Sequence, residues 1–249
     1  MHPTPLDSVG VTEALGKLLR QDPSQYQHVM DGVAHYLREH KRAVSECPDP
    51  ASVAHGFHRA MDQLIADATK QATISCAKGC AHCCYIEVHI TDEEATLLNR
   101  MAEPLGVEID WARVQHQARA DRWRQLSYKD RRCVFLGKDN TCQVYEYRPM
   151  NCRKYMVASP AERCNSLKYP AGEIQLLTAN RAEIMASALF SACGADTMSR
   201  QLLKTKEIAN DHRPERAADA AHSGGPQAER LADAGAASDT AHPPAPLTR

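Results

Sequence analysis

The stretch Cys76-Ala-Lys-Gly-Cys80-Ala-His-Cys83-Cys84 decides how the middle of this chain folds. Its cysteine spacing lets one irregular turn direct several sulfurs toward a common centre. Gly79, just before Cys80, supplies the freedom at positive φ that such a tight loop uses. Thiolates are soft ligands that bind zinc, copper(I) or iron–sulfur clusters in preference to magnesium or calcium. The stretch, residues 76–84, is called the first cysteine block, and it predicts an irregular centre organised by a metal.

A second cysteine block, residues 133–155, follows further along the chain, and Cys164 lies beyond it. Distant sets of thiolates that close one coordination sphere on folding are typical of zinc and iron–sulfur sites. In a reducing compartment such clustered thiols are metal ligands or redox groups rather than disulfides. The candidate metal ligands are eight of the ten cysteines, namely Cys76, Cys80, Cys83, Cys84, Cys133, Cys142, Cys152 and Cys164.

Two further expectations concern the surroundings of these thiols. Successive side chains in extended backbone point to opposite faces, so we expect one of Cys83 and Cys84 to bind a metal. The other would serve a second iron, a second metal or a redox role. Four thiolates around Zn²⁺ or a [4Fe–4S] cluster leave a net charge of about −2. Arg148 and Arg153 are the candidate cations beside the cofactor, where positive charge would raise the reduction potential of a cluster.

The two blocks together resemble the CxxCxxCC cysteine-cluster family. The resemblance rests on Cys76-x3-Cys80-x2-Cys83-Cys84, Cys133-x-Phe-Leu, Cys142-x-Val-Tyr, Arg148-Pro149 and Cys152-Arg153-x-Tyr155, and covers roughly residues 73–156. It implies zinc or iron chelation, in a family often named iron–sulfur oxidoreductases and distantly similar to flagellin lysine methylases, which are linked to S-adenosylmethionine. Seven of the eight candidate ligands occupy the family's cysteine positions, whereas Cys164 lies beyond the matched part. Cys47 and Cys193 lie outside both blocks.

These observations leave three functions open. The first is an iron–sulfur protein with a [4Fe–4S]-type cluster, acting in electron transfer or oxidoreductase chemistry with an electron donor. The second is a structural or chelating zinc site in a protein that binds a protein partner. The third is an adenosylmethionine-linked enzyme that modifies proteins. The sequence names no catalytic residue, and it contains no phosphate-binding loop or dinucleotide fingerprint.

The rest of the chain is predicted to be mainly α-helical, with short strands near the cysteines. Apolar spacing predicts helices over residues 12–20, 24–44, 51–72, 91–103, 110–126 and 173–208, and alternation predicts a strand over 85–90. The turn at Gly137–Asn140 separates two short segments. We expect an N-terminal helical segment (1–72), a cysteine-cluster domain (73–208) and a disordered Ala- and Pro-rich tail (209–249).

The composition of the chain indicates which classes of partner to exclude and which cellular compartment to expect. Lys and Arg number 30 against 31 Asp and Glu, so the formal net charge is −1 and gives no signature of nucleic acid or anionic membrane. The basic segment 113–132 is predicted to be a solvated helix face. From the first residues given we expect no signal peptide, and no apolar run is long enough to span a membrane. We therefore expect a cytoplasmic protein that binds neither nucleic acid nor membrane.

Overall fold

The computed structural model describes residues 16–165, 167–169 and 174–211. Its described elements up to Ile208 belong to one compact unit. Residues 209–211, the described part of a second unit, are the end of the last helix. The tail predicted to be disordered otherwise lies outside the described residues, as does the beginning of the helix predicted at 12–20. Within the described part of the chain, each helix is too short or too polar to cross a membrane.

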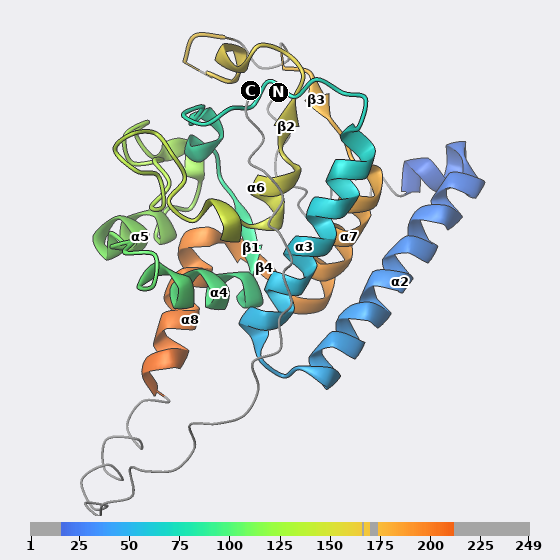
Figure 1. The fold of residues 1–249 in the computed structure, drawn as a ribbon, viewed down its shortest axis with the longest axis horizontal. Helices are drawn as coiled ribbons and strands as arrows, with labels where there is room; N and C mark the ends of the chain where they lie inside the picture. Colours follow the sequence, from blue (N-terminus) through green and yellow to red (C-terminus); the bar gives the residue numbers. More distant parts are fainter. Residues whose placement is uncertain (1–15, 166, 170–173, 212–249) are drawn as a thin grey trace, which may run out of the picture. The chain divides into compact units, whose positions relative to one another are not determined.

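The protein is mainly helical with two short antiparallel ladders, as predicted (Figure 1). Residues 16–21 are helical. The α-helices that follow are α2 (Pro23–Glu46), α3 (Pro50–Thr69), α4 (Asp92–Ala102), α5 (Trp111–Ala118), α6 (Met150–Lys154), α7 (Asn180–Cys193) and α8 (Met198–Asp211). Short 3₁₀ turns are η1 (His82–Tyr85), η2 (Trp123–Gln125), η3 (Tyr145–Tyr147) and η4 (Ala161–Cys164). Strand β1 (His89–Thr91) pairs with β4 (Ala195–Thr197), and β2 (Met156–Val157) pairs with β3 (Leu176–Leu177).

Side-chain caps explain where the long helices begin. Asp22 and Asp49 each accept a hydrogen bond from the backbone N–H three residues on, and a proline follows each as the first helical residue. The capping box predicted at the start of α4 is present: Thr91 accepts from the N–H of Glu94, and the Glu94 carboxylate accepts from the N–H of Thr91. These starts are fixed by residues within one turn of the helix.

Three predicted elements are wrong in their extent. The helix predicted over 110–126 ends at Ala118, and the indole of Trp123 instead donates to the carbonyl of Tyr85, 3.1 Å away. The helix predicted over 173–208 is divided by Gly194, whose φ of 71° is left-handed and turns the chain into β4. The strand predicted over 85–90 is shortened to residues 89–91, because the first cysteine block curls into η1.

Two apolar clusters support the region of the cysteines. Helices α2, α3 and α7 run side by side (Figure 1), and their buried residues meet Met150 at the start of α6. The second cluster gathers residues of β1, α4, α5, α8 and the second cysteine block, with Phe135 at its centre. Packing thus crosses the expected boundary at residue 72, since α3 contacts both α4 and α6.

Candidate metal centre

The first cysteine block is shaped by its own backbone hydrogen bonds. The N–H of Cys80 donates to the carbonyl of Ala77, at 3.0 Å, and Gly79 between them has the positive φ, 86°, that the sequence predicts. The N–H of Cys84 donates to Ala81, at 2.9 Å, which starts the 3₁₀ turn. The turn contradicts the expectation of extended backbone at the adjacent cysteines. Successive side chains of a 3₁₀ helix diverge by about 120° rather than pointing to opposite faces, so both thiols can serve one region.

A tight turn positions two thiols of the second cysteine block. The turn predicted at residues 137–140 is present, and the N–H of Gly137 donates to the carbonyl of Thr141, at 2.8 Å. A single antiparallel bridge between Leu136 and Cys142 follows, which brings Cys142 back toward Cys133. A Cβ added at Gly137 would lie 2.7 Å from Asp139 Oδ1, so the turn leaves little room for a side chain there.

Long-range hydrogen bonds join the two cysteine blocks to each other and to α6. The N–H of Cys133 donates directly to the carbonyl of Cys84, at 2.8 Å. Ser75, just before the first block, donates its N–H to Val157 and its hydroxyl to Ala158, at 2.8 and 3.0 Å. Because Val157 follows α6, these bonds bring Cys76 to the helix that carries Cys152.

Seven of the eight candidate thiols form two groups of four that share Cys83. Within each group, every thiol lies within electrostatic reach of the other three, so each negative charge raises the pKa of its neighbours. The first group is Cys76, Cys80, Cys83 and Cys164. The second group is Cys83, Cys133, Cys142 and Cys152.

The eighth candidate thiol, Cys84, belongs to neither group and lies next to Cys83, the cysteine that both groups share. A hydrogen bond with the Cys84 thiol, together with burial, raises the pKa of Cys83 far above its ordinary value. Burial raises the pKa of Cys133 to about 12 and that of Cys164 to about 11, and neighbouring thiols add to both shifts. Cys76 is exposed and the other seven thiols are partly buried. So many thiols can ionise together only beside a cation, which is the condition that a bound metal meets.

Backbone N–H groups act in the opposite direction on five of the sulfurs, among them Cys83, whose own N–H lowers its pKa. The N–H of the residue two positions on lowers the pKa of Cys80, Cys133 and Cys142, the donors being His82, Phe135 and Val144. The N–H of Val157 does the same for Cys76. Hydrogen bonds of this kind favour the thiolate over the thiol, and they tune the potential of a bound iron–sulfur cluster.

The two predicted cations have different surroundings. The charge of Arg148 lowers the pKa of thiols in both groups, namely Cys76, Cys83, Cys142 and Cys152. Its guanidinium carbon lies 4.1 Å from the centroid of the Tyr145 ring, and its Nε is buried without a hydrogen-bond partner among the described residues. Arg148 therefore faces the thiols with a donor still unused.

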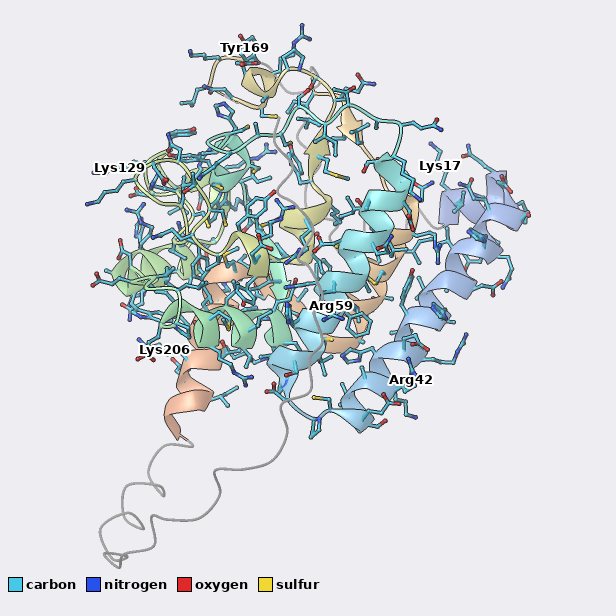
Figure 2. The ribbon with its side chains drawn as sticks, in the orientation of Figure 1. Lys17, Arg42, Arg59, Lys129, Tyr169 and Lys206 are labelled. Carbon is cyan, nitrogen blue, oxygen red and sulfur yellow. The ribbon has the colours of Figure 1, made fainter. Side chains whose placement is uncertain are left out.

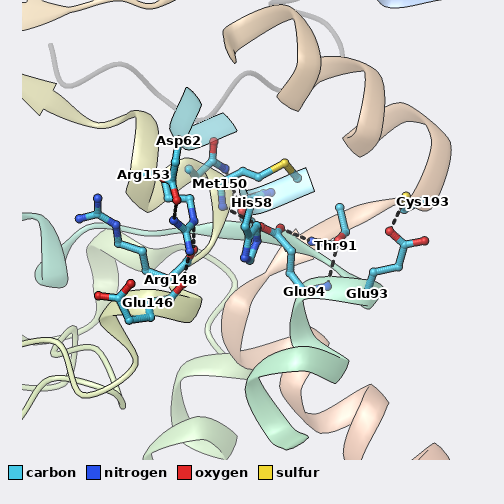
Figure 3. A network of polar contacts seen from close by, with 12 residues as sticks. His58, Asp62, Thr91, Glu93, Glu94, Glu146, Arg148, Met150, Arg153 and Cys193 are labelled. Atoms are coloured by element: carbon cyan, nitrogen blue, oxygen red, sulfur yellow. Dashed lines mark hydrogen bonds and ion pairs between the residues drawn. The ribbon is translucent and has the colours of Figure 1, made fainter. Parts of the chain in front are cut away.

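Arg153 is held by the protein itself. Only 4% of its side chain is exposed, and its guanidinium donates to the carboxylate of Asp62 and to the carbonyls of Arg148 and Glu146 (Figure 3). Its charge lowers the pKa of Cys142, as the prediction of a nearby cation requires. Its bonds show a second role that sequence reasoning missed, because Arg153 fixes the backbone on which Arg148 stands.

Tyr155 lies against the first thiol group. Burial, followed by the charges of Cys164, Cys83 and Cys76, raises the pKa of its phenol to about 12. A neutral, partly buried phenol within reach of these thiols adds no negative charge to the group.

The basic segment 113–132 is engaged largely with the chain's own backbone. Arg131 donates to the carbonyls of Leu126 and Arg124, and Arg132 donates to those of Leu136 and Gly137. Lys129, by contrast, points away from the neighbouring elements (Figure 2). Most of this segment is not helical, so the predicted solvated helix face is limited to α5.

The donor set fits a thiolate-bound metal. Eight thiols are twice the number that one tetrahedral zinc ion or one [4Fe–4S] cluster takes from protein. Within the described residues, no three thiol sulfurs all lie within 4.8 Å of one another. Sulfurs that share one tetrahedral zinc ion, at a Zn–S distance of about 2.3 Å, lie about 3.8 Å apart. The sulfurs are therefore more widely spaced than those around a single zinc ion.

Comparison with known proteins agrees with this reading. Residues 75–170 match the model of the CxxCxxCC family, which is described as "Putative zinc- or iron-chelating domain". The matched segment contains all eight candidate ligands together with Arg148 and Arg153, and it confirms the resemblance found in the sequence. No curated protein and no solved structure matches the chain. Residues 75–170 are thus similar to the CxxCxxCC domain, and this similarity supports metal binding.

Proposed function

We propose that the protein holds an iron–sulfur cluster of the [4Fe–4S] type in its cysteine centre and uses it in electron transfer or oxidoreductase chemistry. The observation that carries the proposal is the gathering of eight thiols by the hydrogen bonds that join the two cysteine blocks, from Cys133 N–H to the carbonyl of Cys84 and from Ser75 to Val157 and Ala158. Each four-thiol group has the four thiolates that a [4Fe–4S] cluster takes, and Cys84 stands beside the shared position. Because Cys83 can complete only one of the two sets, the second group would hold a further cluster or metal ion with Cys84 as its fourth thiolate.

The spacing of the thiols favours a cluster over mononuclear zinc. Thiolates of a cluster bind different irons, so metal atoms lie between their sulfurs and hold them further apart than around one ion. No three of the described thiols have sulfurs that all lie within 4.8 Å of one another, so they lack the close spacing of a single zinc site. The bound cluster would supply one-electron transfer.

Residues of the chain would tune such a cluster. Arg148 offsets the negative charge of the thiolates, and five backbone N–H groups donate to the sulfurs. Both features stabilise the reduced, more negative state and so raise the reduction potential. Tyr155 adds a neutral, partly buried phenol within electrostatic reach of Cys164. An electron donor or acceptor would approach from the side of Cys76, the exposed thiol of the centre.

The alternative is a structural or chelating zinc site in a protein that binds a protein partner. It is supported by the same N–H donors, since zinc thiolates are stabilised in the same way, and by the family's description. No contact described above favours the third candidate, the adenosylmethionine-linked enzyme.

Anaerobic purification tests the proposal. Iron, acid-labile sulfide and zinc would be quantified on the sample used for an absorption spectrum. We expect a broad brown band near ~400 nm, with iron and sulfide in equal amounts. The Cys47→Ser variant is the matched control, because Cys47 lies outside the centre, and it should keep the same spectrum. A colourless protein that holds zinc in whole equivalents, and no iron, would overturn the cluster in favour of the zinc site.

A further inference from the structure

Three donor atoms from three helices converge at a place remote in sequence from the cysteine blocks. His40 belongs to α2, Glu93 to α4, and Cys193 is the last residue of α7. The Nε2 atom of His40 lies 2.7 Å from Glu93 Oε1 and 3.3 Å from Cys193 Sγ. Cys193 Sγ lies 3.6 Å from Glu93 Oε2, and Figure 3 shows the two side chains directed at each other. All three groups offer a ligand atom within 4.8 Å of the other two.

The fold produces this convergence through the ladder between β1 and β4. Thr91 pairs with Ala195 at the end of the ladder. Glu93 and Cys193 each lie two residues beyond this pair, in the first turn of α4 and at the end of α7, so both flank the end of the ladder. Gly194, with its φ of 71°, is the bend that lets α7 stop at Cys193 and the chain enter β4 at once. The packing of α2 against α7 then brings His40 to the same place.

The geometry is that of a ligand set rather than a proton relay. In a Cys–His–carboxylate relay, the two ring nitrogens of histidine contact different partners. Here a single ring nitrogen, Nε2, contacts both the carboxylate and the thiol. Three donor atoms that face one another around one point are arranged as they would be around a cation.

The charges around the trio also call for a cation. The side chains of His40 and Glu93 are only 14% and 16% exposed. Among the described residues, His40 is the one basic group in contact with the Glu93 carboxylate, since the nearby Lys204 pairs with Asp92. Burial and the charges of Glu93, Glu94 and Asp92 raise the pKa of Cys193 to about 12. A divalent ion bound at the sulfur would offset the negative charges that oppose ionisation of this thiol.

We propose that His40, Glu93 and Cys193 form a mononuclear zinc site, separate from the cysteine centre, with its fourth position open to water. One nitrogen, one oxygen and one sulfur ligand suit zinc, and three protein ligands with one open position are typical of catalytic zinc. Tetrahedral donors about 2.1 to 2.3 Å from a zinc ion lie about 3.4 to 3.6 Å apart. The two distances to Cys193 already agree with this spacing. The shorter distance between His40 and Glu93 is a hydrogen bond, which zinc would replace.

Binding balances by proton release. Zinc bonds to the lone pair of neutral His40 Nε2, to the Glu93 carboxylate and to the Cys193 thiolate. The thiol proton, and the proton shared between His40 and Glu93 where histidine is protonated, pass to solvent. The ion would tie α2 to α4 and α7.

Zinc stoichiometry tests the site. The full-length protein would be incubated with excess zinc and a non-thiol reductant and then dialysed, and its zinc and iron would be measured per chain. The Cys193→Ser and His40→Gln variants should each carry one zinc equivalent less than the wild type, with iron unchanged. The Cys47→Ser control should match the wild type. If the wild type and Cys193→Ser bind the same number of zinc equivalents per chain, the three residues are only an ion pair beside a thiol, and the proposal is overturned.

A second measurement needs only the wild-type chain, in case a variant fails to fold. Alkylation of individual cysteines would be followed by peptide mass spectrometry with and without added zinc. We expect zinc to slow the labelling of Cys193 at least tenfold and to leave Cys47 unchanged. A labelling rate of Cys193 that does not respond to zinc would contradict the site. Because these residues belong to no thiol group of the cysteine centre, either result is independent of the cluster proposed there.

Discussion

The carboxylate of Glu94 accepts a hydrogen bond from the backbone N–H of Met150, with Glu94 Oε1 2.6 Å from Met150 N. The same oxygen lies 3.0 Å from His58 Nε2, and both side chains are 1% exposed. Glu94 thereby links α3, α4 and the start of α6, the helix that carries Cys152. The cysteine centre is thus anchored to the helices through a residue that is not itself near a thiol in the sequence.

Replacing Glu94 with Gln should destabilise the protein strongly. The carboxylate accepts hydrogen bonds from Thr91, Met150 and His58. In glutamine, one of these oxygens becomes an NH₂ group, which is a donor and cannot accept the hydrogen bond made at that position. We expect a loss of about 2–4 kcal/mol in the free energy of unfolding. Urea denaturation followed by circular dichroism would measure it. The exposed Glu39→Gln variant on α2 should lose less than about 0.5 kcal/mol, and equal losses would refute the anchoring role.

The pair of Asp49 and Arg100 should give a stability difference that depends on pH. Hydrogen bonds from Arg100 and then from Ser52 hold the pKa of Asp49 well below its ordinary value. A lowered pKa in the folded state contributes stability above the unfolded pKa of about 3.9, and this is lost as the pH falls toward the lowered value. Because both side chains are partly exposed, we expect Asp49→Asn to cost about 0.5–1 kcal/mol at pH 7.

The pH series itself is the measurement for this pair. Denaturation of the wild type and of Asp49→Asn between pH 7 and pH 3 should show the difference shrinking below about pH 4. In an Arg100→Gln background, the same replacement should lose most of its effect, because the main cause of the pKa shift is gone. A difference that stays constant down to pH 3 would show that Asp49 acts only as a helix cap.

Serine at Cys80 and Cys142 should separate the two thiol groups. Cys80 belongs to the first group and Cys142 to the second, so each single variant should lose the metal of one group. The double variant should lose both metals and become less soluble, because metal binding and folding are coupled in such centres. Metal analysis and the soluble yield would be compared with those of Cys47→Ser. Full metal retention in the double variant would rule out both residues as ligands.

Arg148→Gln should lower the reduction potential of the bound cluster. The substitution removes the positive charge that acts on thiols of both groups, and the reduced cluster is the more negative state. We expect a shift on the order of tens of millivolts to more negative values, and a smaller one for Arg148→Lys. An anaerobic spectroscopic redox titration would measure the potential. Arg42→Gln, at an exposed position on α2, is the control. An equal shift of the potential in this variant would show that Arg148 does not tune the cluster.

Local rules in the sequence were enough for several elements. The capping box at Thr91, the turn at residues 137–140 and the positive φ of Gly79 were all predicted and are present. Each depends on hydrogen bonds or backbone freedom within about four residues. The two cysteine blocks could also be recognised in this way, because the short spacing of their thiols is itself the signal, and the family match confirms them.

The tertiary structure decided what depends on distant partners. The early end of α5, the division of the last helical stretch at Gly194 and the arrangement of thiols around Cys83 arise from packing and from hydrogen bonds between segments far apart in the chain. His40, Glu93 and Cys193 share no sequence pattern, since the register of β1 and β4 and the packing of α2 bring them together. The sequence by itself therefore determined which residues can bind a metal through closely spaced thiols. Only the folded chain, in which long-range contacts fix where helices stop and which side chains meet, determined how those thiols are grouped and where a separate set of donors converges.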